Sequence, residues 1–154
     1  MKSKGLATID ATDVKILEIL QRDGRIPMKQ LAAMVCMSTP STTERVHKLE
    51  DAGVITGYKA VVNPEAIGRS IIATVLVNFE PTEQAAFDRY IAASPDVQDY
   101  DTVTGKSSAS IRIACKNMAH FQKLIHALHE FGATETYVVV ESKLRDAPLQ
   151  PIED

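Results

Sequence analysis

The 154-residue sequence predicts an α+β protein made of a winged helix-turn-helix domain followed by a ferredoxin-like βαββαβ domain. Three short helical patterns, each with apolar residues at helical spacing, follow one another before Gly53. After Ser70 the pattern changes to four apolar, β-branched strands and two amphipathic helices in the order β-α-β-β-α-β. The predicted organisation is a helix-turn-helix domain at residues 1–62, a linker at 63–69, a sheet domain at 70–145 and an irregular tail at 146–154.

The first two predicted helices form the scaffold of the N-terminal domain. Asp10 or Thr12 can cap the first helix, and Asp23-Gly24 ends it. Pro27 then stands where a second helix can begin, because the first turn of a helix does not need the N–H that proline lacks. This second helix is short, with an apolar stripe of Leu31, Met34 and Val35.

The third predicted helix begins at the hydroxyl cap Ser38, and its exposed face is hydroxylated and basic. Hydroxyls near its N-terminus suit DNA base edges, while Arg45 and Lys48 suit phosphates. Glu44 either reads a cytosine amino group or pairs with a neighbouring cation, and we favour the pairing. A solvated face used for protein contact is the alternative. The predicted DNA-contacting residues are Ser38, Thr39, Ser41, Thr42, Glu44, Arg45 and Lys48, although Thr42 also lies on the face that Val46 and Leu49 bury.

The segment after Gly53 predicts the wing and the domain boundary. Residues 54–62 alternate well enough for strands or a small wing. Asn63-Pro64 breaks this pattern, which places the boundary between about Val61 and Gly68.

The second domain is predicted as an antiparallel sheet with both helices on one face. Its other face needs a partner, and Val75, Val77, Val138 and Val140 are the apolar residues expected there. Dimerisation through this face is the expected solution. The predicted strands are Ser70–Phe79, Val97–Thr104, Ala109–Cys115 and Glu135–Glu141, and the predicted helices are Thr82–Ala93 and Met118–Glu130.

Charge and cysteine content narrow the classes of function. The net charge is −3, but residues 1–60 hold nine Lys/Arg against seven Asp/Glu, while residues 61–154 hold eight against thirteen. This asymmetry places any nucleic-acid footprint in the first half, and a solvated surface of mixed charge is the alternative explanation of the same count. The two cysteines, Cys36 and Cys115, lie far apart, so neither a disulfide framework nor a zinc site is predicted, and His126 with His129 lacks a third metal ligand.

The sequence shows neither a secretion signal nor an apolar run that could span a membrane, so we expect a cytoplasmic protein. It also shows no nucleophile-base pair, metal set or cofactor loop, which argues against an enzyme.

A series of short motifs runs in order through both predicted domains. In this order they resemble the leucine-responsive regulatory protein (Lrp)/AsnC family of prokaryotic transcription regulators. The resemblance implies a regulator of double-stranded DNA that dimerises and assembles further into tetramers or octamers, with an amino-acid effector bound between dimers near Gly105. The motifs are Ile9-Asp-Ala-Thr-Asp-Val-Lys-Ile-Leu17, Asp23-Gly-Arg25, Thr43-Glu-Arg-Val46, Leu49-Glu50, Ala52-Gly-Val-Ile55, Gly57-Tyr58, Asn63-Pro64, Val103-Thr-Gly105 and Thr136-Tyr-Val-Val-Val-Glu141.

The chain departs from this family at the effector loop. The family commonly has Gly-Asp-Tyr/Phe-Asp there, and this chain has Gly105-Lys-Ser-Ser108, which lacks both carboxylates that help to hold an ammonium group. The effector is then an amino acid, an anion or carboxylate drawn to Lys106, or absent. The predicted effector-binding residues are Thr104, Gly105, Lys106, Ser107 and Ser108.

A second departure is Cys36, which stands where the family usually has glycine in the turn of the helix-turn-helix. A residue with a Cβ must then accept that turn, which predicts a positive φ with mild strain. A buried structural thiol is expected here in preference to a redox switch. Two other functions stay open: an architectural protein that wraps DNA with little sequence preference, and a ferredoxin-like small-molecule-binding protein that does not act on DNA.

Overall fold

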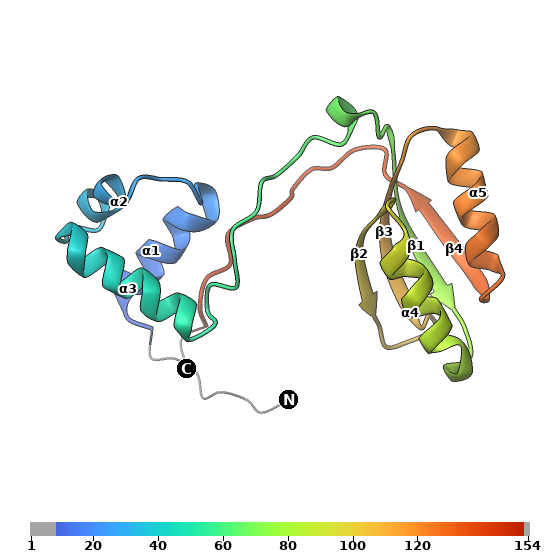
Figure 1. Ribbon diagram of the computed structural model, residues 1–154, viewed down its shortest axis with the longest axis horizontal. Coiled ribbons are helices and arrows are strands. Elements are labelled where there is room, and N and C mark those ends of the chain that lie inside the picture. The colour runs from blue at the N-terminus through green and yellow to red at the C-terminus, as the bar shows by residue number, and fades with distance from the viewer. Residues whose placement is uncertain (1–8, 153–154) are drawn as a thin grey trace. The chain divides into compact units, whose positions relative to one another are not determined.

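The computed structural model describes residues 9–152, and the chain divides into two compact units (Figure 1). One unit contains the three N-terminal helices up to Val61 and takes in the chain again from Leu144. The other unit runs from Val62 to Lys143 and contains the sheet. No helix within residues 9–152 is long and apolar enough to cross a membrane.

The helical unit consists of α1 (Ala11–Arg22), α2 (Met28–Met34) and α3 (Thr39–Asp51). The Asp10 carboxylate accepts hydrogen bonds from the N–H groups of Thr12 and Asp13 at 2.9 Å each. In turn, the Asp13 carboxylate accepts a hydrogen bond from the Asp10 N–H at 3.1 Å. This reciprocal capping box fixes the start of α1. The three helices enclose a small apolar core of Ile16, Leu31, Val35, Val46 and Leu49.

The turn between α2 and α3 contains Cys36 at a φ of +56°, which confirms the predicted positive φ. The turn is closed by the Met37 N–H, which donates to the Ala32 carbonyl at 2.9 Å. The Cys36 side chain is exposed, so the expectation of a buried thiol is wrong.

The predicted wing is wrong, because residues 54–62 form no strand. A strand needs a neighbour that takes up its N–H and C=O groups, and no segment within residues 9–152 pairs with this one. The chain continues through a short 3-10 helix, η1 (Glu65–Ile67), to the sheet.

The sheet has four antiparallel strands in the order β2-β3-β1-β4, with α4 and α5 packed against one face. Phe87 of α4 and Leu128 of α5 are fully buried against Val75 and Ile111 of the two central strands. This arrangement is the predicted βαββαβ fold. The elements are β1 (Ile71–Asn78), a 3-10 turn η2 (Pro81–Glu83), α4 (Gln84–Ala93), β2 (Val97–Thr102), β3 (Ala109–Cys115), α5 (Met118–His129) and β4 (Ala133–Val138), as Figure 1 shows.

The last strand lies earlier in the sequence than its β-branched residues suggested. It begins at Ala133 instead of Glu135 and ends at Val138 instead of Glu141. The start is set by Gly132, where a Cβ atom would lie 2.0 Å from the Asn78 carbonyl oxygen. Only a glycine permits the backbones to approach so closely there, and Ala133 then pairs with Asn78.

The apolar residues of the open sheet face also differ from the prediction. Val75 and Val77 are fully buried beneath the helices, and Val140 lies beyond the end of β4. Side chains alternate across a strand, so the open face of β1 instead carries Ile72, Thr74 and Leu76. Each of these three side chains is half-buried.

The C-terminal segment returns to α1 of the helical unit. The Gln21 side chain donates to the Leu149 carbonyl at 2.9 Å and accepts the Leu149 N–H at 2.8 Å. The Gln150 side chain donates to Glu18 at 2.6 Å. Two distant parts of the sequence therefore form one unit.

Candidate nucleic-acid interface and effector loop

The N-terminal end of α3 presents a cluster of exposed hydroxyls. Ser38, Thr39 and Ser41 are all exposed, and the Ser38 and Ser41 hydroxyl oxygens lie 2.8 Å apart in a hydrogen bond. Ser38 caps the helix, because its hydroxyl accepts the Ser41 N–H at 3.3 Å. These hydroxyls can donate to and accept from base edges or phosphates.

Thr42 does not belong to this exposed cluster. Its exposed fraction is 0%, and its hydroxyl donates to the Ser38 carbonyl at 3.0 Å. The helical period places Thr42 on the same side as buried Val46 and Leu49, facing the core. A residue without exposed surface cannot reach a base, so Thr42 is removed from the predicted DNA contacts.

Arg45 is held by two carboxylates at the start of α1. One guanidinium nitrogen, Nη1, lies 2.7 Å from Asp10 Oδ2 and 2.9 Å from Asp13 Oδ1. The Asp13 residue is buried, so this cation compensates a carboxylate that has left water. Two hydrogen bonds raise the pKa of Arg45, and the bond to Asp13 has the larger effect, followed by the bond to Asp10. The pKa of Asp10 is lowered mainly by the hydrogen bond from the Asp13 N–H and next by the hydrogen bond from Arg45.

Lys48 pairs with Glu44 one helical turn earlier, at 2.7 Å, and both side chains are exposed. This contact lowers the pKa of Glu44 through the Lys48 hydrogen bond and its charge. The pairing is the one favoured for Glu44 from the sequence. Because exposed ion pairs contribute little, Lys48 can leave Glu44 for a phosphate at small cost.

The last turn of α3 is fixed by Tyr58. The Tyr58 hydroxyl donates to Glu50 at 2.9 Å, and the Nδ1 atom of His47 lies 3.1 Å from the other Glu50 oxygen. Partial burial and the Glu50 contact raise the pKa of Tyr58 to about 12. A Cβ added to Gly24 would lie 3.2 Å from the Tyr58 ring, so the ring packs on the turn after α1. Sequence reasoning missed this role, for which the motif Gly57-Tyr58 was the only signal.

The loop between β2 and β3 carries the predicted effector-binding residues. Thr104, Gly105 and Lys106 are exposed, Gly105 has a φ of +128°, and Ser107 is half-buried. Lys106 forms no ion pair within residues 9–152, so its ammonium is available to an anionic group.

Ser108 has a structural role at the base of this loop. Its N–H donates to the Val77 carbonyl at 2.9 Å, and its hydroxyl lies 3.2 Å from the Phe79 nitrogen and 3.0 Å from the Phe79 oxygen. These contacts tie the loop to the end of β1. Ser108 therefore positions the loop, whereas Lys106 is the residue free to contact a ligand.

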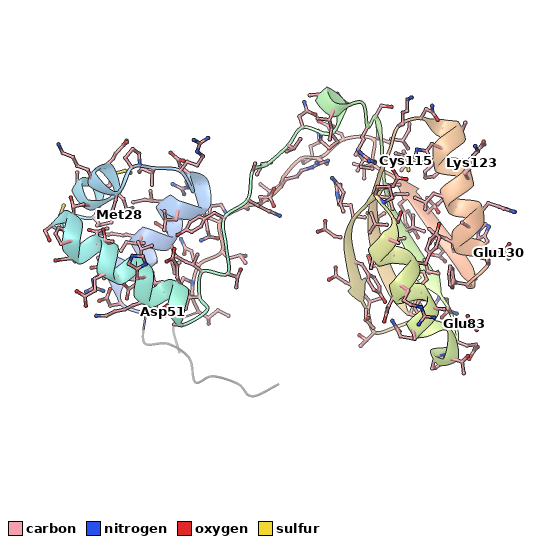
Figure 2. All side chains as sticks on the ribbon, in the orientation of Figure 1. Met28, Asp51, Glu83, Cys115, Lys123 and Glu130 are labelled. Atoms are coloured by element: carbon pink, nitrogen blue, oxygen red, sulfur yellow. The ribbon has the colours of Figure 1, made fainter. Side chains whose placement is uncertain are left out.

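Two cavities lie away from this loop. One of about 570 Å³ follows α3 past Ser41, Arg45 and Lys48, and one of about 390 Å³ lies between α4 and α5, beside Asp96 and His120. Within residues 9–152 no group of three or more His, Cys, Asp or Glu side chains is arranged to hold a metal ion. The side chains of both units are drawn in Figure 2, where Met28 and Asp51 mark the start of α2 and the end of α3.

Comparison with known proteins adds independent information. Residues 9–50 match the AsnC-type helix-turn-helix domain, and residues 72–149 match the Lrp/AsnC ligand-binding domain. The leucine-responsive regulatory protein of Rhizobium meliloti is 38% identical over 139 residues, which cover 88% of this chain and 88% of that protein. The proline dehydrogenase transcriptional activator of Rhodobacter capsulatus is 31% identical over 141 residues, which cover 87% of this chain and 92% of that protein.

Solved structures share the fold. A transcriptional regulator of Neisseria meningitidis in complex with L-methionine superposes with a TM-score of 0.87 at 24% identity, over 92% of this chain and 96% of that one. LrpC of Bacillus subtilis superposes with a TM-score of 0.84 at 25% identity, over 88% of this chain and 97% of that one. The two family matches follow one another along this chain in the same order as the three helices and the four-stranded sheet.

Proposed function

Since the chain belongs to the Lrp/AsnC family of DNA-binding transcription regulators, we propose that it recognises a specific operator as a cytoplasmic homo-oligomer and responds to a small effector. The observation that carries sequence-specific recognition is the exposed hydroxyl cluster of Ser38, Thr39 and Ser41 at the N-terminal end of α3. The recognition helix of a helix-turn-helix contacts base edges with its N-terminal residues, in the major groove.

Operator selection from a random duplex library tests this recognition. We expect enrichment of a site with two half-sites about 10 base pairs apart, because paired recognition helices enter successive major grooves. Replacing both Thr39 and Ser41 with alanine weakens binding to the preferred operator by about 1–3 kcal/mol for each lost base contact. Binding to unrelated duplex stays unchanged. If unrelated duplex competes for the wild-type chain as well as the selected operator does, the architectural alternative is favoured.

The open face of the sheet supports the proposed dimer. On β3, Arg112 points to this face, since its neighbours Ile111 and Ile113 are fully buried on the helix side. One guanidinium nitrogen, Nη2, is buried and has no hydrogen-bond partner within residues 9–152. A second copy covering Ile72 and Leu76 would bury apolar area and supply an acceptor.

Sedimentation of the Leu76→Asp variant tests this interface. A carboxylate in the centre of an apolar interface is desolvated without a partner, so we expect the variant to sediment as a monomer and to bind DNA more weakly. A Lys143→Ala variant, changed on an exposed side chain outside the sheet, is the control and stays oligomeric. An unchanged oligomer in Leu76→Asp would rule out this face. We propose in addition that dimers assemble into a tetramer or octamer, as the family resemblance implies.

The effector is proposed to be an amino acid or small carboxylate whose carboxylate group contacts Lys106. The support is the exposed ammonium of Lys106 on a loop held by Ser108, together with the L-methionine complex of the Neisseria meningitidis regulator. A ligand that binds the native protein raises its apparent stability, so thermal-shift screening over amino acids and small carboxylates identifies it. The shift disappears in Lys106→Ala and is retained in Lys106→Arg. A flat screen of the wild-type chain would show that this protein has no such effector.

A further inference from the structure

The cations of α3 are already paired, while a second set of cations in the same unit is not. Arg45 is bound by Asp10 and Asp13, and Lys48 by Glu44. Five other basic side chains of this unit are exposed and form no ion pair within residues 9–152. Lys15 and Lys59 are isolated in the sequence, whereas Arg22, Arg25 and Lys29 lie within one eight-residue segment. These three residues, the basic corner, lie where α1 ends and α2 begins.

The backbone of the basic corner is fixed by local hydrogen bonds. The Asp23 N–H donates to the Ile19 carbonyl at 2.9 Å, and the Asp23 carboxylate accepts the Arg25 N–H at 2.9 Å. The same Asp23 supplies its carbonyl to the Ile26 N–H at 3.3 Å. Residues 22–29 thus contain three cations and a single carboxylate, which is already engaged by the backbone. The corner presents net positive charge on an ordered turn.

Tyr58 places this corner beside the last turn of α3. Its ring packs on Gly24 inside the corner, at 3.2 Å from the position of a Cβ, and its hydroxyl donates to Glu50 near the end of α3 at 2.9 Å. The exposed hydroxyls lie at the opposite, N-terminal end of the same helix. A helix lying in the major groove has phosphates along both walls of the groove, so cations beside its C-terminal end are placed to reach one wall.

We propose that the basic corner is the main phosphate-binding site of the DNA-binding unit and that Arg45 is not part of the footprint. The ligand is the phosphodiester backbone of duplex DNA, contacted without regard to sequence. Arg45 instead neutralises Asp13 and joins α3 to α1, because withdrawing it would leave a buried carboxylate unpaired. This assignment rests on the DNA-binding function of the family and gives that function its electrostatic component.

The salt dependence of binding to a random-sequence duplex tests the assignment, since phosphate contacts need no operator. Each phosphate contact contributes about 0.9 to the slope of log K against log salt concentration, so the Arg25→Ala, Lys29→Ala double variant flattens the slope by about 1.8 per protomer. Its thermal unfolding stays unchanged, because neither side chain has an ion-pair partner to lose in the described part of the chain. The charge-conserving variant Arg25→Lys, Lys29→Arg retains the slope.

Lys15→Ala is the matched control, because Lys15 is exposed on the middle of α1, outside the corner. The assignment is overturned if the double variant keeps the wild-type slope, or if Lys15→Ala flattens the slope as much per residue. It is also overturned if Arg45→Ala, measured where urea unfolding shows it folded, flattens the slope by about 0.9. If the wild-type chain binds duplex with no salt dependence, DNA binding through phosphates is itself contradicted. This result differs from the results that overturn only the assignment of phosphate binding to the basic corner.

Discussion

Arg45 has the chemistry of a phosphate-binding residue, but its contacts are those of a structural ion pair. Its type and its position on α3 suit a phosphate contact, and the structure places it between Asp10 and Asp13. An ordered guanidinium that compensates a buried carboxylate contributes to stability, because removing one partner leaves the other desolvated and unpaired. Lys48, which is paired only with exposed Glu44, is the α3 cation that can still exchange its partner for DNA.

The Arg45→Ala variant is expected to unfold at lower urea concentration than the wild type, because Asp13 loses its charged partner in a buried position. Arg45→Lys recovers only part of the difference, since an ammonium is more strongly hydrated than a guanidinium and is less suited to pairing with a buried carboxylate such as Asp13. Urea unfolding followed by circular dichroism measures both variants. Equal midpoints for wild type and Arg45→Ala would show that the ion cluster contributes nothing to folding.

Asp10 makes the stability of the helical unit dependent on pH. The Asp13 N–H and Arg45 lower its pKa below the ordinary value of 3.8, so the unfolded chain binds a proton at higher pH than the folded chain does. The stabilisation is therefore complete above about pH 5 and is lost as the pH falls through the folded pKa, below 3.8. Urea unfolding at pH 5 and pH 3 should show a smaller loss in Asp10→Asn than in wild type; an equal loss in both would contradict this linkage.

At the scale of helices, strands and turns, the sequence patterns predicted where most elements lie, but they did not predict the contacts between distant elements. Caps, breakers and apolar periods located α1, α2 and α3 and the order of the sheet elements. They could not place β4, because its start depends on how closely Gly132 approaches Asn78 across the sheet. The partners of Arg45 were equally hidden, since Asp10 lies 35 residues away in the sequence. Local patterns carry no information about such distant contacts.

The turn between α2 and α3 should be stabilised by glycine at position 36. Cys36 adopts a φ of +56°, a region that costs a residue with a Cβ about 1–2 kcal/mol and glycine almost nothing. Part of this gain is offset by the greater freedom of glycine in the unfolded chain, about 0.4–1 kcal/mol. Cys36→Gly is therefore expected to be more stable than Cys36→Ala by about 1 kcal/mol. Thermal unfolding of the two variants compares them directly, and a less stable glycine variant would argue against strain at this turn.

The start of β4 should not tolerate a side chain at position 132. A Cβ there would lie 2.0 Å from the Asn78 carbonyl oxygen, which belongs to backbone and cannot move aside alone. Gly132→Ala is expected to destabilise the sheet unit by about 1–3 kcal/mol, as overpacking does elsewhere. Gly68→Ala is a useful comparison, because a Cβ at Gly68 meets nothing within 4 Å and any cost there comes from its φ of +80° alone. Hydrogen exchange of the β1 amides would report the loss, and unaltered exchange in Gly132→Ala would exclude the close approach.

At the scale of the whole molecule, the sequence order and the structural units do not coincide. The helical unit contains residues from both ends of the described chain, since Gln21 and Glu18 bind Leu149 and Gln150. The tail has neither an apolar period nor a strand pattern, so the sequence alone predicted only that it is irregular. Its docking depends on hydrogen bonds of side-chain amides, from Gln21 to the backbone of Leu149 and from Gln150 to the Glu18 carboxylate, and many polar segments could offer such groups.

Deleting residues 147–154 should destabilise the helical unit and leave the sheet unit unaffected. The deletion removes the two hydrogen bonds between Gln21 and Leu149, which together contribute about 1–3 kcal/mol. Hydrogen exchange should then accelerate in α1 and stay constant in β1 and β3. Gln21→Ala in the undeleted chain should reproduce part of the effect on α1, because it removes the same two bonds but keeps the bond from Gln150 to Glu18. Exchange in α1 that is the same with and without the tail would show that the tail does not support this unit.

The docking of Leu149 on α1 also has a consequence for protein synthesis. The helices of the DNA-binding unit are translated before the sheet unit, but the segment that completes their unit is translated after it. At about 5–20 residues per second, the sheet unit emerges and can fold while the helical unit still waits for its final contacts. Those contacts form only after the sheet unit has been synthesised, so the DNA-binding unit is completed later than the sheet unit that follows it in the sequence.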